Sequence, residues 1–259
     1  MLDVHTHLFH PKIAQKVCLA LKEHYNISPQ GTGLKEDLYQ HLKKGKFNKA
    51  VVLCAATNPN QVIPANNWAI SLKNYKTLIP FGTIHPEYKD WQKELARLAK
   101  HQIKGLKIHP DFQGFDLASK KLFPIWEEIG SKFWILIHIG DQLPPEKNFS
   151  SPQKLVQVLK NFPRLKIIVA HLGGYLHWEY ALHYIIGKDI FLDTSSTLPF
   201  IPKNILKKIL NKHDKEKILF GSDYPLFLPE QEKYRILNNL NDNFWAQLEE
   251  NSTNFLQIL

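Results

Sequence analysis

Short apolar runs recur along the chain, and longer segments that mix polar and apolar positions separate them. Runs of this length, apolar on both faces, are typical of strands in a parallel sheet that helices cover. The pattern predicts eight strands, within residues 2–8, 50–55, 78–84, 103–109, 134–140, 166–171, 190–195 and 218–223. Eight strands with crossover connections predict a single (β/α)8 barrel of the TIM type over residues 1–259.

Several segments between these runs have helical periodicity. Ile13, Val17 and Leu21 repeat every four residues, and Ser151-Pro152 predicts an N-cap followed by proline at the first helical position. We expect these apolar stripes to pack as core in an outer ring of helices rather than to form a binding surface. The long segment from residue 10 to 33 is also able to cover one end of the barrel.

Length and composition agree with one barrel. The chain has 259 residues, of which 44% are hydrophobic, and no linker, repeat or low-complexity segment favours two domains. No apolar run approaches the roughly 18 residues that span a membrane, and the start of the chain lacks the regions of a secretory signal. Two cysteines, Cys18 and Cys54, give no disulfide pattern. We therefore expect a cytoplasmic protein without membrane contacts.

The net charge is +9, and its lysines alternate with apolar residues at helical spacing or lie in short connections. Solvated helix faces have this pattern. No arginine-rich or aromatic-interleaved stretch accompanies the charge, so we do not expect a nucleic-acid partner.

Polar residues stand where the predicted strands end. His5 and His7 lie on the same side of the first strand because alternate residues share a face. His138, His171 and Asp223 end later strands, and the carboxyl ends of barrel strands form one mouth. A lone histidine at a strand end is more often structural, but convergence at one mouth favours a functional site.

This ordered set resembles the amidohydrolase superfamily of metal-dependent hydrolases, in particular the branch that contains the aminocarboxymuconate-semialdehyde and resorcylate-type decarboxylases. The resemblance extends over nearly the whole chain. It rests on Asp3-Val4-His5-Thr6-His7, Gly105-Leu106-Lys107-Ile108-His109-Pro110, the His138 strand, Ala170-His171-Leu172-Gly173-Gly174, Gly221-Ser222-Asp223-Tyr224-Pro225, and a closing helix around Glu250-Asn251-Ser252-Thr253-Asn254-Phe255-Leu256.

The resemblance implies that His5, His7, His138 and Asp223 bind one divalent ion. Zinc suits imidazole and carboxylate ligands, and manganese, iron or cobalt are alternatives. Asp223 would orient a water molecule or accept its proton, and His171 would act as general acid/base and stabilise developing negative charge.

Further residues are predicted to contact the substrate. Lys107 and His109 share strand parity and should point to the mouth, where Lys107 would bind an anion or a carbonyl. A structural lysine, or a bridge between two metal ions, is the alternative for Lys107. His85 and Asp111 are also predicted substrate contacts, and Asp193 would orient its neighbours.

The preferred function is hydrolysis of an amide, ester, lactone or related bond in a small molecule by metal-activated water. Non-oxidative decarboxylation is the alternative, disfavoured because Arg97 and Arg164 lie outside the strand ends and leave no arginine for a substrate carboxylate. A TatD-type deoxyribonuclease ranks lower because Lys107 and His109 stand where a glutamate is expected. A catalytically inactive barrel that acts as a binding protein also ranks lower, and homo-oligomerisation is left open.

Overall fold

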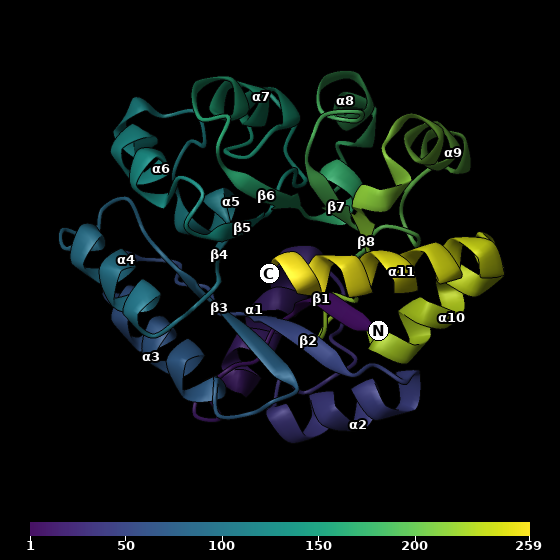
Figure 1. The fold of residues 1–259 in the computed structure, drawn as a ribbon, viewed down its shortest axis with the longest axis horizontal. Helices are drawn as coiled ribbons and strands as arrows, with labels where there is room; N and C mark the ends of the chain where they lie inside the picture. Colours follow the sequence, from purple (N-terminus) through teal and green to yellow (C-terminus); the bar gives the residue numbers. More distant parts are fainter.

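The computed structural model describes residues 1–259 and consists of eight parallel strands surrounded by helices (Figure 1). The strands pair in chain order from first to last, which confirms the predicted barrel. Each predicted range overlaps one strand. The strands are β1 Leu2–Thr6, β2 Lys49–Leu53, β3 Leu78–Thr83, β4 Gly105–Ile108, β5 Trp134–Ile137, β6 Lys166–Val169, β7 Phe191–Asp193 and β8 Ile218–Leu219.

Backbone hydrogen bonds just beyond β8 close the barrel onto β1. The amide of Val4 donates to Phe220 O at 2.9 Å, and the amide of Asp223 donates to His5 O at 2.8 Å. The amide of His7 donates to Tyr224 O at 2.7 Å. The closing seam therefore brings the first histidines and the last aspartate of the predicted site together.

Hydrophobic side chains form an inner and an outer layer. The inner layer fills the barrel with residues such as Val4, Val51 and Leu136, and the outer layer lies between strands and helices. At the base of the barrel, Phe255 packs on Trp134, with ring centroids 4.8 Å apart. Phe255 belongs to the long C-terminal helix α11 (Asp242–Ile258), which crosses the barrel in Figure 1.

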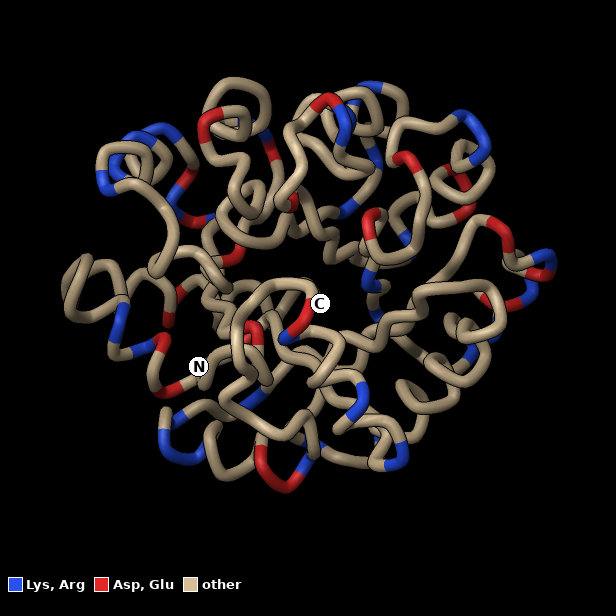
Figure 2. Tube along the Cα trace, turned by 180° about the vertical axis from the view of Figure 1, so that it is seen from behind, with Lys and Arg blue, Asp and Glu red and all other residues tan.

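Most other helices form the outer ring. The predicted cap is confirmed, because the Ser151 side chain accepts from Lys154 N and Pro152 begins the helix. None of the helices combines the length and apolar character needed to cross a membrane. Acidic and basic residues intermingle around the ring (Figure 2). These helices are α2 Lys35–Gly45, α3 Val62–Leu72, α4 Trp91–Lys100, α5 Pro110–Gln113, α6 Phe123–Ile129, α7 Pro152–Asn161, α8 Trp178–Tyr184, α9 Lys203–Lys212 and α10 Pro229–Asn239, with short 3-10 turns at Pro59–Gln61, Lys120–Leu122, His171–Gly173 and Lys215–Lys217.

Helix α1 (Ala14–Tyr25) departs from the prediction. Its apolar stripe was expected to pack as core, and this was wrong: Ile13 is 48% exposed, and Ile13, Val17 and Leu21 line a cavity at the barrel mouth. Helical periodicity reports only that one face is apolar, and a ligand cavity can take such a face as well as a core can. The 10–33 segment thus lies over the end of the barrel opposite α11.

Candidate active site

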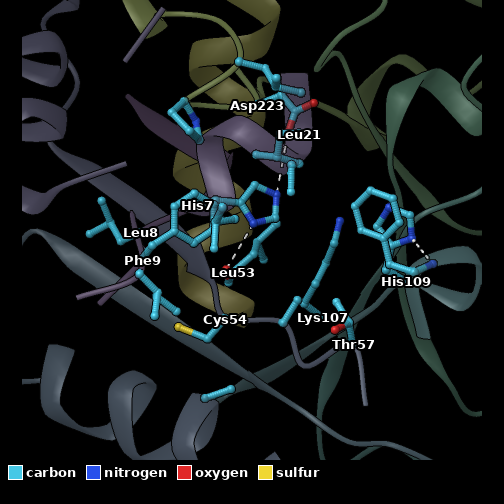
Figure 3. A pocket seen from close by; sticks show the side chains of 18 of the residues that line it. His7, Leu8, Phe9, Leu21, Leu53, Cys54, Thr57, Lys107, His109 and Asp223 are labelled. Carbon is cyan, nitrogen blue, oxygen red and sulfur yellow. Dashed lines mark hydrogen bonds and ion pairs between the residues drawn. The ribbon is translucent and has the colours of Figure 1, made fainter. Parts of the chain in front are cut away.

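A cavity of about 1100 Å³ opens at the carboxyl ends of the strands. Most of the predicted site residues line it, and Figure 3 shows several of them. They are His5, His7, Lys107, His109, His138, His171 and Asp223. His85 and Asp111 are absent from the lining.

His5 is oriented by a buried carboxylate behind it. Its Nδ1 lies 2.8 Å from Asp193 Oδ2, and a carboxylate only accepts, so Nδ1 carries the proton. Its Nε2 faces the mouth, 3.3 Å from His7 Nε2 and 3.3 Å from Asp223 Oδ1. Burial acts to raise the pKa of Asp193, but the combined effect of His5, His171 and the Ser195 hydroxyl lowers this pKa far below its usual value.

Backbone carbonyls orient the other three histidines in the same way. His7 Nδ1 donates to Leu53 O at 3.1 Å, His171 Nδ1 to Ser195 O at 2.9 Å, and His138 Nε2 to Gly140 O at 2.7 Å. Each carbonyl can only accept, so the opposite ring nitrogen is free of hydrogen. Burial lowers the pKa of His7 to about 3 and that of His171 to about 4, and the pKa of His138 falls well below its usual value for the same reason.

These unprotonated nitrogens face one another. His138 Nδ1 and His171 Nε2 are 3.1 Å apart, and ligand atoms of His5, His171 and Asp223 all lie within 4.8 Å of one another. Lone pairs that face each other repel unless a cation lies between them. Neutral imidazoles with one carboxylate are a donor set that zinc, manganese, iron and cobalt accept. The residues therefore fit a divalent ion. The group contains His171 and two of the four predicted ligands, His5 and Asp223. Of the other two, His7 Nε2 lies 3.6 Å from Asp223 Oδ1, and His138 contacts the group through His171.

Asp223 and His171 both occupy the left-handed backbone region, with φ of 65° and 60°. Non-glycine residues adopt this region rarely, and it is enriched at functional sites. Trp178 Nε1 donates to His171 O at 2.8 Å, and this hydrogen bond helps to hold the left-handed conformation of His171. Asp223 Oδ2 accepts from Ser196 Oγ at 2.5 Å. Burial opposes ionisation of Asp223, but His5 and His171 lower its pKa, so the carboxylate stays charged.

Lys107 is 1% exposed, and its amino group reaches into the cavity between His7 and His109 (Figure 3). Its Nζ lies 3.4 Å from His5 Nε2 and forms no ion pair. Burial lowers the pKa of Lys107 to about 8, although Asp223 and Asp193 oppose the change.

His109 lies in an aromatic stack beside the cluster. Its ring is 3.8 Å from His138 and 4.0 Å from Phe112, centroid to centroid. Its Nε2 is 3.3 Å from the hydroxyl of Tyr25, which belongs to α1. Burial lowers the pKa of His109 well below its usual value.

His85 and Asp111 lie behind the cavity wall and support its loops. His85 Nε2 donates to Gln113 O at 3.0 Å, and Asp111 accepts from Phe149 N at 3.1 Å and from the Ser150 hydroxyl. A second group of potential ligand atoms joins Asp111 to His109 and His138. The hydrogen bonds from Phe149 N and the Ser150 hydroxyl already occupy the carboxylate of Asp111.

Sequence analysis missed Ser195, Ser196 and Tyr25. The Ser195 hydroxyl lies 3.0 Å from both His5 Nδ1 and His171 Nδ1. The polar run that follows Asp193 could have indicated both serines. Tyr25 continues the four-residue repeat of the α1 stripe, but the assumption that this stripe packs as core concealed it.

Comparisons with known proteins bear on the family and the fold of this chain. The sequence model of the family described as amidohydrolase matches residues 2–244. No curated protein matches the chain. A dihydroxybenzoic acid decarboxylase from Polaromonas, solved with manganese and 2-nitroresorcinol, is 13% identical, with 99% of this chain and 96% of that chain covered and a TM-score of 0.72.

Two further solved structures have the same fold. The 5-carboxyvanillate decarboxylase of Sphingomonas paucimobilis is 12% identical, with 98% of each chain covered and a TM-score of 0.71. A probable 2-pyrone-4,6-dicarboxylic acid hydrolase from Acinetobacter baumannii is 17% identical, with 98% of this chain and 97% of that chain covered and a TM-score of 0.69.

Proposed function

Because the chain belongs to the amidohydrolase family, we propose that it is a metal-dependent decarboxylase of small aromatic or unsaturated carboxylic acids. The observation that carries this proposal is the Lys107 amino group, which is buried, faces the cavity and forms no ion pair within the protein. A buried cation is costly unless it is paired, and a substrate carboxylate would pair it. The decarboxylases among similar structures support the same chemistry.

The sequence-based preference for hydrolysis depended on the lack of an arginine at the mouth. Lys107 removes that argument because it supplies a positive charge at the floor of the cavity. Lysine binds an anion as a point charge and does not need the planar fork of arginine.

His5, His7, His138 and Asp223, with His171 beside them, would hold the divalent ion. Bound there, it would supply Lewis-acid charge that stabilises negative charge on the substrate. When His5 Nε2 serves as a ligand, the Lys107 ammonium loses that acceptor and becomes available to the substrate carboxylate. The ligand roles and the role of Lys107 are thus compatible.

Decarboxylation breaks the bond from the substrate carbon to the carboxyl group and leaves the electron pair on that carbon. The carbon must then gain a proton as carbon dioxide leaves. We assign this transfer to His171, whose Nδ1 is committed to Ser195 O. Its Nε2 would first take up a proton from water and then give that proton to the carbon. The apolar walls favour loss of the charged group because they exclude water.

Hydrolysis is the second candidate, and the solved hydrolase of the same fold supports it. In that reaction Asp223 would take the proton of the attacking water through one carboxylate oxygen, while the Ser196 hydroxyl donates to the other, Oδ2. A lactone substrate distinguishes this candidate from decarboxylation.

The test is to load purified protein with manganese or zinc and to measure carbon dioxide release from hydroxybenzoic and unsaturated dicarboxylic acids, beside lactone opening. We expect carbon dioxide release. His171→Asn should lower kcat by about 10²- to 10⁴-fold, as loss of a proton-transfer group does. Lys107→Met should lower kcat/KM by about 10- to 100-fold, because it removes a charged hydrogen bond.

Lys104→Met is the matched control, since this exposed lysine lies just before the same strand. This variant should leave kcat and kcat/KM unchanged. Lactone opening without carbon dioxide release would favour the hydrolase. A folded, metal-loaded protein that is inactive on both panels would contradict both candidates.

A further inference from the structure

The cavity continues well beyond the histidine cluster. Ligand cavities commonly measure roughly 300 to 1,000 Å³, and this one, at about 1100 Å³, lies above that range. A single-ring acid with its carboxylate at Lys107 would leave much of the space unfilled. The remaining space lies between α1 and α3.

We name this space the outer groove, and helices α1 and α3 form its walls. The α1 wall presents Val17, Ala20 and Leu21, and the α3 wall presents Ala65 and Trp68. Both walls are mainly apolar. Trp68 is fixed in place because its indole Nε1 donates to Leu8 O at 2.9 Å.

The groove is continuous with the candidate metal centre. The ring of His7 stacks on Phe9 with centroids 6.3 Å apart, and Leu8 and Phe9 lead outward from the cluster (Figure 3). A ligand that touches Lys107 can therefore extend past His7 without crossing the protein.

Three polar side chains at the rim of the groove are paired within the protein. Thr57 Oγ1 donates to Gln61 Oε1 at 3.0 Å, and the Asn67 side chain accepts from Arg97 at 3.0 Å. Ser71 Oγ donates to Trp68 O at 2.7 Å. Lys12 and Lys16 also line the cavity, but most of the surface that α1 and α3 present to the groove is apolar.

We propose that the outer groove binds an apolar tail, so that the substrates are elongated carboxylic acids with an alkyl or aryl extension. This inference rests on the proposed function, which places the carboxylate at Lys107. Burial of each tail carbon between α1 and α3 would add affinity in proportion to the area removed from water.

The test is calorimetric titration of the manganese-loaded protein with benzoate, 4-propylbenzoate and 4-pentylbenzoate. We expect Kd to fall by about two- to fourfold for each added methylene, as for partial to full burial. Ala65→Trp should fill the groove, which would abolish the gain with tail length and leave benzoate binding unchanged. Ala20→Trp on the opposite wall tests the same space if Ala65→Trp does not fold.

Ala99→Trp, at an exposed position on α4, is the matched control and should retain the gain. Lys107→Met separates the hypothesis of the apolar groove from the hypothesis that Lys107 binds the substrate carboxylate. If benzoate binds and Lys107→Met weakens it, but tail length has no effect, the groove inference is overturned while the carboxylate site stands. If none of the three acids binds, the carboxylate site itself fails.

Discussion

Asp193 orients a proposed ligand without lining the cavity. It accepts from His5 Nδ1 and, through its other oxygen, from His171 N at 3.1 Å. Carboxylates behind metal-binding histidines fix the ring tautomer and raise its basicity. The metal affinity should therefore depend on a residue that never touches the ion.

We expect Asp193→Asn to weaken binding of zinc by about 10- to 100-fold, because the neutral amide is a poorer acceptor for His5. Competition with a chromophoric chelator measures the affinity directly and does not depend on turnover. Asp189→Asn, at an exposed carboxylate paired with Lys217, is the control. Equal affinities in both variants would show that Asp193 does not orient His5.

His213 is a buried histidine remote from the cavity. Its Nδ1 accepts from Gly187 N at 3.1 Å, and its Nε2 donates to Ile190 O at 3.1 Å. Burial lowers its pKa below the usual 6.5, which is the value expected in the unfolded chain. As the pH falls below 6.5 the unfolded state binds more protons than the folded state, so this part of the stability is lost.

We therefore expect His213→Gln to lower Tm most at pH 7 to 8, and the difference from the parent protein to narrow as the pH falls below 6.5. Thermal unfolding followed by circular dichroism between pH 5 and 8 measures it. His183→Gln removes an exposed histidine and should show no such narrowing. A constant difference in Tm between His213→Gln and the parent protein from pH 5 to 8 would contradict the lowered pKa of His213.

At the scale of elements, α1 packs on the core only through Tyr25, and polar contacts supply most of its remaining attachment. Ala14 is its only buried residue. Its C-terminal end is fastened by His24 Nε2, 3.1 Å from Asp141 Oδ2, and by Gln142 Nε2, which donates to His24 O at 2.8 Å. Elements with little buried surface open at low free-energy cost.

We expect His24→Ala to speed amide hydrogen exchange in residues 14–25 and to leave exchange in the strands unchanged. The physical reason is the loss of the Asp141 contact, which joins α1 to the loop after β5. Lys22→Ala, on the exposed face of the same helix, is the control. Faster exchange throughout the barrel would mean that α1 unfolds only with the whole molecule.

At the scale of the molecule, α11 closes the base of the barrel. Phe255 is 1% exposed and packs on Trp134 and Phe191. Since the mouth lies at the opposite end, the base can contribute to stability without contacting the site. This separation is common in (β/α)8 barrels.

We expect Phe255→Ala to lower the free energy of unfolding by about 3–5 kcal/mol, because it removes a buried aromatic ring and leaves a cavity. Urea unfolding measures this change, and bound metal per folded chain should stay constant. Ile258→Ala, at a position 53% exposed on the same helix, should change stability by less than about 0.5 kcal/mol. A small effect at Phe255 would place the stabilising contacts elsewhere.

The strands, the barrel and the order of the residues at its mouth could all be predicted from the amino-acid sequence. Strand periodicity and apolar runs are local properties, and parallel strands in chain order carry their ends to one edge. His5, His7, His138, His171 and Asp223 therefore meet where the pattern predicted.

Three features could not be read from the sequence: where α1 lies, which nitrogen of each histidine donates a hydrogen bond, and that His85 and Asp111 are absent from the cavity lining. These features depend on partners distant in sequence, such as Asp193 for His5 and the β2 carbonyl of Leu53 for His7. An apolar stripe or a histidine is compatible with several such partners. The choice among them is made when the barrel closes, because packing then determines which groups lie within hydrogen-bonding distance.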